Sequence, residues 1–181
     1  MQDTIAIIFD FDDTLAPDTT SAFLQTLGID VRRFWSETVG KRIDDGWDPI
    51  PAYLYEIIQI SRGEMNKQIT EEMLCRFGRT VEPYSRATRI CERLRKHAAS
   101  VNPNVSVEFY VISSGMGTIL RATRVAKHFK HIWACEFHYA DDGVIDFPCN
   151  VVSFTDKTRY IFHVSKGIFG DRYVGKPFEV N

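Results

Sequence analysis

The chain opens with a short apolar run that leads directly into acidic residues. The run Thr4–Phe9 reads "TIAIIF", and Asp10, Asp12 and Asp13 follow it in "DFDDT". Apolar, β-branched residues at successive positions are typical of a strand that is buried on both faces of a parallel sheet. Carboxylates this close together repel one another unless a cation or a proton is shared among them. The run therefore predicts a buried strand with a binding site at its carboxyl end.

A second apolar run, "VSVEFYVI" at Val105–Ile112, predicts another central strand. Between the two strands, the segments "SAFLQTLG", "PAYLYEIIQISRG" and "NKQITEEMLCRFG" have helical patterns, and each ends at a glycine. This stretch is much longer than the crossover that joins two parallel strands. We therefore expect an α-helical cap over residues 18–82, inserted into a core formed by residues 1–17 and 83–181.

The rest of the chain alternates between helix and strand patterns. A helix is expected after Pro83, a loop and helix in "SSGMGTILRATRVAKHF", and a strand in "IWACEFHYA". After a turn at "DDG", a strand is expected in "VVSF", and then a helix that starts with capping residues Thr155 and Asp156 and ends at Gly167. This alternation predicts an α/β fold, a Rossmann-like open parallel sheet with helices on both faces, with ligands bound at the carboxyl ends of the strands.

Composition narrows the classes of partner. The chain has 22 basic and 24 acidic residues and a formal charge of −2, which favours neither nucleic acid nor an anionic membrane. No run approaches the about 18 apolar residues of a membrane span, so we expect no membrane or nucleic-acid partner. The four cysteines are scattered without a C-x-x-C pair, which is typical of reduced thiols in a cytoplasmic protein: Cys75, Cys91, Cys135 and Cys149.

The spacing of the first two aspartates suits phosphoryl transfer. If Asp10 ends a strand, Asp12 lies two residues on and can face the same cavity. One carboxylate can then attack phosphorus while the other exchanges a proton with the leaving oxygen, and Mg²⁺ relieves the repulsion among the acids and the phosphate. Two structural alternatives are that the aspartates only cap a turn, or that they belong to a calcium loop. The glycine and glutamate of an EF-hand loop do not follow them.

The pattern D-x-D-x-T after an apolar strand, formed here by Asp10, Asp12 and Thr14, resembles the first motif of the haloacid dehalogenase-like hydrolase superfamily. "FYVISSG" resembles its second motif, with Ser113 at the end of the strand. Lys157 matches the third motif. Its separation from Ser113 along the chain is similar to that in phosphoserine-phosphatase-like members.

The resemblance implies a role for each matched residue in a phosphatase that acts on a small phosphorylated metabolite. It makes Asp10 the nucleophile and Asp12 the general acid and then base, and both would hold Mg²⁺. Its implied phosphate-binding residues are Ser113, Ser114, Gly115 and Lys157. Lys166 competes with Lys157 for the third motif. A lysine at a helix C-terminus is already explained by the helix dipole, so Lys157 is preferred.

The fourth motif of the family, an apolar strand ending in Gly-Asp with a further acid, has no clear match. "IFGDRYVGK" contains Gly170 and Asp171, but no acid follows at the required interval. We expect either a piece of a longer phosphatase or an incomplete metal site, and hence, as the alternative function, an impaired protein that serves as a binding or scaffold module. Dehalogenase chemistry is less favoured, because the superfamily's dehalogenases lack the second aspartate.

Functional roles can be considered for three further groups of residues, on weaker sequence signals. The set His128, His131, Cys135 and His138 suggests a zinc site, but Cys135 and His138 would point to opposite faces of one strand. The set Arg121, Arg124, Lys127 and Lys130 is typical of a solvated helix face. In this superfamily the inserted lid supplies specificity, and the candidate lid residues are Trp35, Trp47, Arg32, Arg33 and Arg42.

Overall fold

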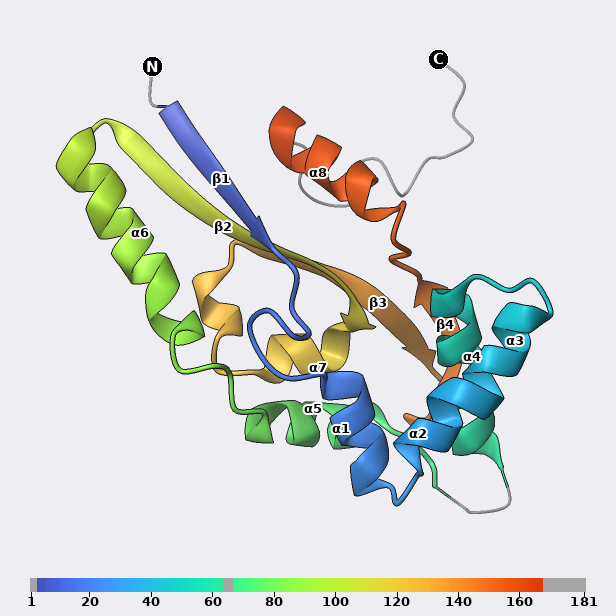
Figure 1. Ribbon diagram of the computed structural model, residues 1–181. Coiled ribbons are helices and arrows are strands. Elements are labelled where there is room, and N and C mark those ends of the chain that lie inside the picture. Colours follow the sequence, from blue (N-terminus) through green and yellow to red (C-terminus); the bar gives the residue numbers. More distant parts are fainter. Residues whose placement is uncertain (1–2, 64–66, 168–181) are drawn as a thin grey trace.

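The computed structural model describes residues 3–63 and 67–167, which form a four-stranded sheet with helices around it (Figure 1). The strands, in the sheet order β1-β2-β3-β4, are β1 (Asp3–Phe9), β2 (Val105–Met116), β3 (His131–Tyr139) and β4 (Ile145–Asn150). The helices are α1 (Thr19–Thr26), α2 (Val31–Arg33), α3 (Gly40–Asp44), α4 (Pro49–Arg62), α5 (Glu71–Thr80), α6 (Ala87–Val101), α7 (Gly117–Ala122) and α8 (Lys157–Lys166). A π-helical segment η1 (Phe34–Val39) and a 3₁₀ turn η2 (Ala126–His128) complete the described elements.

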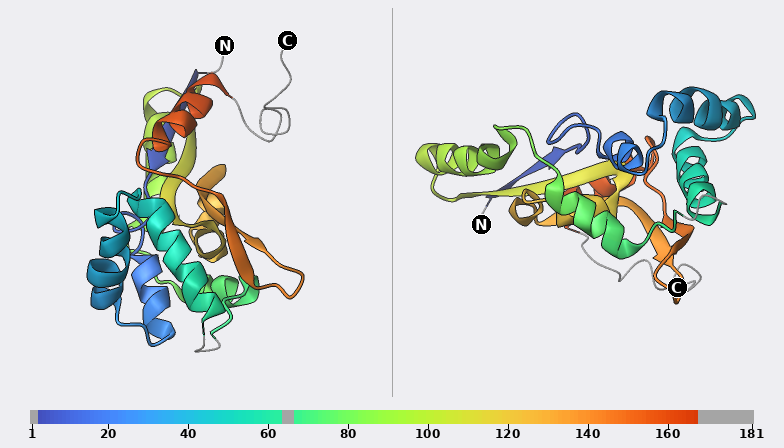
Figure 2. Two further views of the ribbon diagram at one scale, coloured as in Figure 1. Left: turned by 90° about the vertical axis from the view of Figure 1, so that its right-hand side faces the viewer. Right: turned by 90° about the horizontal axis from the view of Figure 1, so that it is seen from below.

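Helices cover both faces of the sheet. On β2, the ring of Phe109 lies 4.7 Å from the guanidinium of Arg95 in α6. The next residue, Tyr110, stacks on Trp133 at 5.9 Å, and Trp133 contacts Tyr160 of α8 at 5.3 Å. Because successive strand residues point to opposite faces, α6 and α8 lie on opposite sides of the sheet, as the two views of Figure 2 illustrate. The predicted α/β, Rossmann-like fold is confirmed, with one difference at the edge of the sheet.

That difference is β4, which runs antiparallel to β3 while β1, β2 and β3 are parallel. The strand expected in "VVSF" is wrong, because β4 comes earlier and residues 151–154 lie outside any strand. The reason is the turn at "DDG", where Gly143 has φ +77° and reverses the chain, so that pairing with β3 begins at once. Pro148 lies within β4, a position that an edge strand tolerates.

β1 forms where it was expected but is not buried on both faces. Its residues Asp3–Ala6 are exposed, and the side chain of Ile5 is 48% exposed. Within the described ranges, β1 pairs with β2 alone and is therefore an edge strand. The parallel register places Phe9 opposite Val111, so β1 ends where β2 continues through Ser113 and Gly115 to Met116.

Local capping explains where the helices between β1 and β2 begin. Asp18, Asp48 and Thr70 accept hydrogen bonds from the first turns of α1, α4 and α5, which satisfies amides that have no helical partner. These helices correspond to the three that were predicted, whereas α2, η1 and α3 were not foreseen. The division of the chain into a core and a cap at residues 18–82 stays a prediction.

Three helix boundaries differ from expectation. α5 continues past Gly78, where a Cβ would collide with the Ile119 carbonyl and come within 2.7 Å of the Ala122 Cβ. Gly78 therefore lets α5 pack closely on α7. α7 itself ends at Ala122, so the long helix expected up to Phe129 is wrong, and the helix expected after Pro83 begins only at Ala87. In the described ranges, no helix has both the length and the apolar character needed to cross a membrane.

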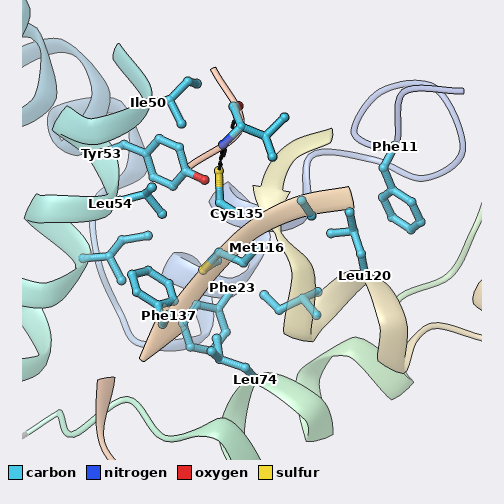
Figure 3. Close-up of a cluster of buried hydrophobic side chains, with 14 of the residues drawn as sticks. Phe11, Phe23, Ile50, Tyr53, Leu54, Leu74, Met116, Leu120, Cys135 and Phe137 are labelled. Atoms are coloured by element: carbon cyan, nitrogen blue, oxygen red, sulfur yellow. Dashed lines mark hydrogen bonds between the residues drawn. The ribbon is translucent and has the colours of Figure 1, made fainter. Parts of the chain in front are cut away.

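One cluster of buried apolar side chains joins the helices between β1 and β2 to the sheet (Figure 3). Phe23 of α1, Leu54 of α4 and Leu74 of α5 belong to it together with Met116 of β2 and Leu120 of α7, and each is at most 1% exposed. The helices between β1 and β2 are thus anchored to the carboxyl end of β2 and to α7. This packing places their side chains beside the residues predicted to do chemistry.

Candidate active site

The loop after β1 turns both predicted carboxylates toward one pocket. Phe11, between Asp10 and Asp12, is completely buried. Its carbonyl accepts hydrogen bonds from the amides of three following residues, at 2.8 to 3.3 Å, and Asp13 adopts a left-handed conformation with φ 57°. Non-glycine residues rarely adopt that conformation, and they do so mainly in tight turns and at functional sites. With Phe11 as the anchor, the residues on either side, Asp10 and Asp12, both line the pocket.

The Asp10 carboxylate forms an ion pair with Lys157, the lysine predicted for the third motif. The Lys157 ammonium lies 2.6 Å from Asp10 Oδ2, and the other carboxylate oxygen accepts the Phe11 amide at 2.8 Å. Lys157 is the first residue of α8. Asp156 does not cap this helix as predicted, because its carboxylate is bound to Arg159 by two hydrogen bonds at 2.8 Å.

Asp12 is held more deeply than Asp10. Its Oδ1 accepts the amide of Thr19 at 2.9 Å and the hydroxyl of Thr19 at 2.7 Å, while Oδ2 has no hydrogen-bond partner among the described residues. Burial raises the pKa of Asp12 above its ordinary value against the opposing Thr19 bonds, and the charges of Asp18 and Asp10 add to the rise. A carboxyl that keeps its proton more readily suits a general acid.

An irregular stretch near the end of β2 lies against Asp12. The β2–β3 register shifts between Ile112 and Met116, and within this interval the Gly115 amide donates to Ser113 Oγ at 3.0 Å. A Cβ on Gly115 would lie 2.5 Å from Asp12 Oδ2, so only a glycine allows the carboxylate this close. Ser113 and Gly115 are therefore brought beside Asp12, although the Gly115 amide, expected to bind phosphate, is already engaged by Ser113.

Ser114 is tied to helix α4 and to β3. Its carbonyl accepts the hydroxyl of Tyr53 at 2.5 Å and the thiol of Cys135 at 3.4 Å, and Figure 3 shows these two side chains facing one another. Burial raises the pKa of Cys135 to about 11 and that of Tyr53 well above its ordinary value, so both stay protonated donors. The Ser114 hydroxyl itself is buried and has no partner among the described residues.

These residues surround a pocket of about 420 Å³. Its described lining is Asp10, Asp12, Asp13, Asp18, Thr20, Trp35, Pro49, Ile50, Tyr53, Ser113, Ser114, Gly115, Phe154 and Lys157. All six residues predicted for the site are present. Of the candidate lid residues only Trp35 lines the pocket, while Arg42 is bound to Glu56 at 2.6 Å and lies over the ring of Trp47. No sequence signal pointed to Tyr53 or Phe154, which lie in segments predicted only as a helix and a strand.

The donor chemistry of the pocket fits Mg²⁺, a hard cation that proteins usually hold with one or two carboxylates plus water and phosphate. Asp10 and Asp12 supply such a pair, and Asp12 Oδ2 is not taken by the described chain. Within the described residues, no group of three or more His, Cys, Asp or Glu side chains could hold a metal ion. The fourth-motif candidates Gly170 and Asp171 lie outside the described residues.

The zinc alternative is not supported by the described side chains. Cys135 is 1% exposed, whereas His138 is exposed and lies 2.7 Å from Asp146. Lys166, the competitor of Lys157, is at the far end of α8 and does not line the pocket.

The basic residues predicted to form one helix face belong to several elements, because α7 is short. Three of them are in ion pairs: Arg121 with Glu136, Arg124 with Glu82, and Lys130 with Glu108.

Comparison with known proteins supports the fold. No family model matches the chain. A protein of uncharacterized function from Borreliella burgdorferi is 23% identical over 190 residues, which cover 93% of this chain and 67% of that protein. A hydrolase of the HAD family from Salmonella enterica serovar Typhi matches in structure with TM-score 0.63 and 11% identity. The match covers 90% of this chain but only 51% of that hydrolase, so this chain spans about half of its length.

A phosphoserine phosphatase solved as a phospho-aspartyl intermediate analogue matches with TM-score 0.64 and 16% identity, over 93% of this chain and 75% of that one. A substrate-bound phosphoserine phosphatase matches with TM-score 0.62 and 16% identity, over the same shares of the two chains. The described chain therefore has the fold of the haloacid dehalogenase-like hydrolases, in the form seen in phosphoserine phosphatase.

Proposed function

We propose that this protein is a phosphomonoester hydrolase that acts on a small phosphorylated substrate through an aspartyl-phosphate intermediate. The observation that carries this proposal is the shared pocket: Asp10, Asp12, Ser113 and Lys157 come from three separate parts of the chain and line one cavity. The likeness to phosphatase structures is consistent with it. A lid role for residues 18–82 is supported by Trp35, Ile50 and Tyr53, which form part of the pocket wall.

In the proposed reaction, a carboxylate oxygen of Asp10 attacks phosphorus and the bond from phosphorus to the ester oxygen breaks. Asp12 gives its proton to the departing oxygen, and the alcohol leaves. Water then attacks the phosphorus of the aspartyl phosphate. Asp12 takes the proton of that water, the bond from phosphorus to Asp10 breaks, and inorganic phosphate is released with Asp10 restored. Lys157 and Ser113 bind the phosphate oxygens throughout.

The charge at Asp10 has to be offset before a phosphate dianion can approach it. Lys157, 2.6 Å from Asp10 Oδ2, supplies one positive charge. We propose that Asp10 and Asp12 also hold Mg²⁺, which when bound would supply further positive charge between the carboxylates and the phosphate.

The decisive experiment replaces the nucleophile. Asp10→Asn should abolish the Mg²⁺-supported turnover of p-nitrophenyl phosphate, because an amide cannot form the aspartyl phosphate. Asp30→Asn, at an exposed helix N-cap outside the pocket, is the matched control and should keep the parent rate. If Asp10→Asn hydrolyses the ester as fast as the parent, the assignment is wrong.

Two other functions would give different results. A binding or scaffold module would show no turnover in the parent protein, and the absence of Mg²⁺ and orthovanadate binding in a calorimetric titration of the stably folded chain would favour it. Dehalogenase chemistry would release chloride from a haloacid. We also propose a cytoplasmic location, supported by four cysteines that are all free thiols, two of them buried.

A further inference from the structure

Part of the pocket lining is not needed for the proposed phosphate chemistry. Beside the groups proposed to handle phosphate, the pocket is lined by the aromatic rings of Trp35, Tyr53 and Phe154 and by the carboxylate of Asp18. Four of the described lining residues are aspartates and one, Lys157, is basic. Lys157 is already bound to Asp10. The described pocket thus offers aromatic faces and negative charge to whatever part of a substrate lies beyond its phosphate.

The Asp18 carboxylate forms no ion pair with any described side chain. It is the N-cap of α1 and accepts the amide of Ser21 at 2.9 Å and the hydroxyl of the same residue. A carboxylate has about four lone-pair sites on two oxygens, so the capping role leaves acceptor capacity directed elsewhere. Within the described ranges Asp18 forms no salt bridge, although it lines the pocket.

Trp35 is fixed beside Asp18 through a shared partner. The indole Nε1 donates to Ser21 Oγ at 2.8 Å, and that hydroxyl donates in turn to Asp18. The indole also packs against Tyr53, with ring centroids 5.7 Å apart. The face of tryptophan is the best aromatic surface for an organic cation. A fixed indole next to an unpaired carboxylate is therefore suited to an alkylammonium group.

A polar atom of one lining residue lacks a partner among the described residues. The Ser114 hydroxyl is buried and has no hydrogen-bond partner among the described residues, and Ser114 lines the same cavity. Buried polar atoms are rarely left unpaired.

We infer that the pocket selects phosphomonoesters whose alcohol half carries an alkylammonium cation and no carboxylate, with Asp18 and Trp35 as the specificity-determining residues. The inference rests on the proposed phosphatase function. It follows from the charge of the pocket lining, because a cation is attracted by Asp18 and the indole. A substrate carboxylate would meet aspartates and no described arginine of the pocket.

The test compares three esters that differ in the charge of the alcohol half. They are choline phosphate, its neutral carbon isostere 3,3-dimethylbutyl phosphate, and 2-phosphoglycolate, which carries a carboxylate. Binding is measured by calorimetry with Mg²⁺ on the full chain carrying Asp10→Asn, so that no ester is consumed. We expect choline phosphate to bind about tenfold more tightly than the neutral isostere, and 2-phosphoglycolate to bind more weakly than either.

Substitutions then locate the preference. In the same background, Asp18→Asn keeps a side chain that caps helices well. It should reduce the ratio of the affinities for choline phosphate and its neutral isostere to about one, and Trp35→Leu should do the same. The controls are Asp30→Asn, which makes the same change at another N-cap, and Trp47→Leu, since neither residue lines the pocket. Both controls should keep the tenfold ratio.

The outcomes separate this inference from the proposed function. Equal affinities for the charged and neutral esters overturn the inference, and so does a preference that survives Asp18→Asn and Trp35→Leu together. Turnover of p-nitrophenyl phosphate by the parent chain is a separate readout. If it is present without a preference for the cation, the phosphatase proposal stands and the substrate class is wrong. If it is absent while the preference is present, the cation site stands and the phosphatase proposal fails.

Discussion

The ammonium of Lys157 lies 2.6 Å from Asp10 Oδ2, although 147 residues separate the two in the chain. One residue follows the first strand and the other begins the last described helix. A lysine in the first turn of a helix is disfavoured by the helix dipole, and the Asp10 carboxylate offsets that cost. The pair therefore links a helix start to the proposed nucleophile.

Removing this lysine should affect chemistry far more than folding. Lys157→Met should lower kcat for p-nitrophenyl phosphate by about 100-fold or more, the usual loss when one donor to a developing anion is removed. The matched control is Lys166→Met at the exposed end of the same helix, which should stay near the parent rate. Equal rates for both variants would contradict the assignment of Lys157.

Substitutions at two glycines should have different effects, one on catalytic activity and the other on the stability of the fold. Gly115→Ala places a Cβ 2.5 Å from Asp12 Oδ2 and should lower kcat/KM by about tenfold or more, because a misplacement of about 1 Å is costly at a reacting centre. Gly78→Ala crowds the α5–α7 contact and should lower the free energy of unfolding by about 1–3 kcal/mol.

Urea denaturation and steady-state kinetics on both variants check this separation. A Gly115→Ala protein with unchanged kcat/KM would contradict the close approach of Asp12.

The raised pKa of Asp12 predicts a stability cost at neutral pH. Burial lifts its folded-state pKa above the ordinary 3.8, so the folded protein holds the proton more tightly than the unfolded chain. The resulting stabilisation is fully present at pH values below the pKa of Asp12 in the unfolded chain. It is lost as the pH rises through the pKa of Asp12 in the folded protein. Asp12→Asn should therefore be more stable than the parent at neutral pH, although inactive.

Melting temperatures measured with a chelator between about pH 4 and pH 8 test this sign. The advantage of Asp12→Asn should shrink as the pH falls. An advantage that grows toward acid pH would mean that the pKa is lowered rather than raised.

The thiol of Cys135 should be inert in the folded protein. Burial raises its pKa to about 11, and only the thiolate reacts rapidly with alkylating agents. At about pH 8, iodoacetamide should label the exposed Cys149 well before Cys135, as read by peptide mass spectrometry. In urea the two should react at similar rates. Early labelling of Cys135 in the native protein would show that the contact with Ser114 opens readily.

The convergence of the proposed catalytic residues could be predicted because it depends on topology. Asp10 and Ser113 each follow an apolar strand, and the carboxyl ends of neighbouring parallel strands meet at one edge of the sheet. Lys157 could be chosen over Lys166 because the helix dipole makes its position costly without a nearby anion. These arguments need only local patterns and strand order.

The remaining features depend on tertiary packing that local patterns do not encode. Tyr53 is one of several apolar or aromatic residues on α4, and only the fold shows that its hydroxyl reaches Ser114. The exposure of Ile5 was missed because an apolar strand has the same pattern at an edge as at the centre of a sheet. The position of β4 was missed because the reversal at Gly143 outweighs the β-branched pair Val151 and Val152.

The bond from the Tyr53 hydroxyl to the Ser114 carbonyl joins α4 to the carboxyl end of β2, and both residues line the pocket. A displacement of α4 away from β2 would have to break this bond, and among the described side chains the Ser114 carbonyl would then be held by the thiol of Cys135 alone. The position of Ser114 in the pocket therefore depends on a helix residue that lies 61 positions away in the chain.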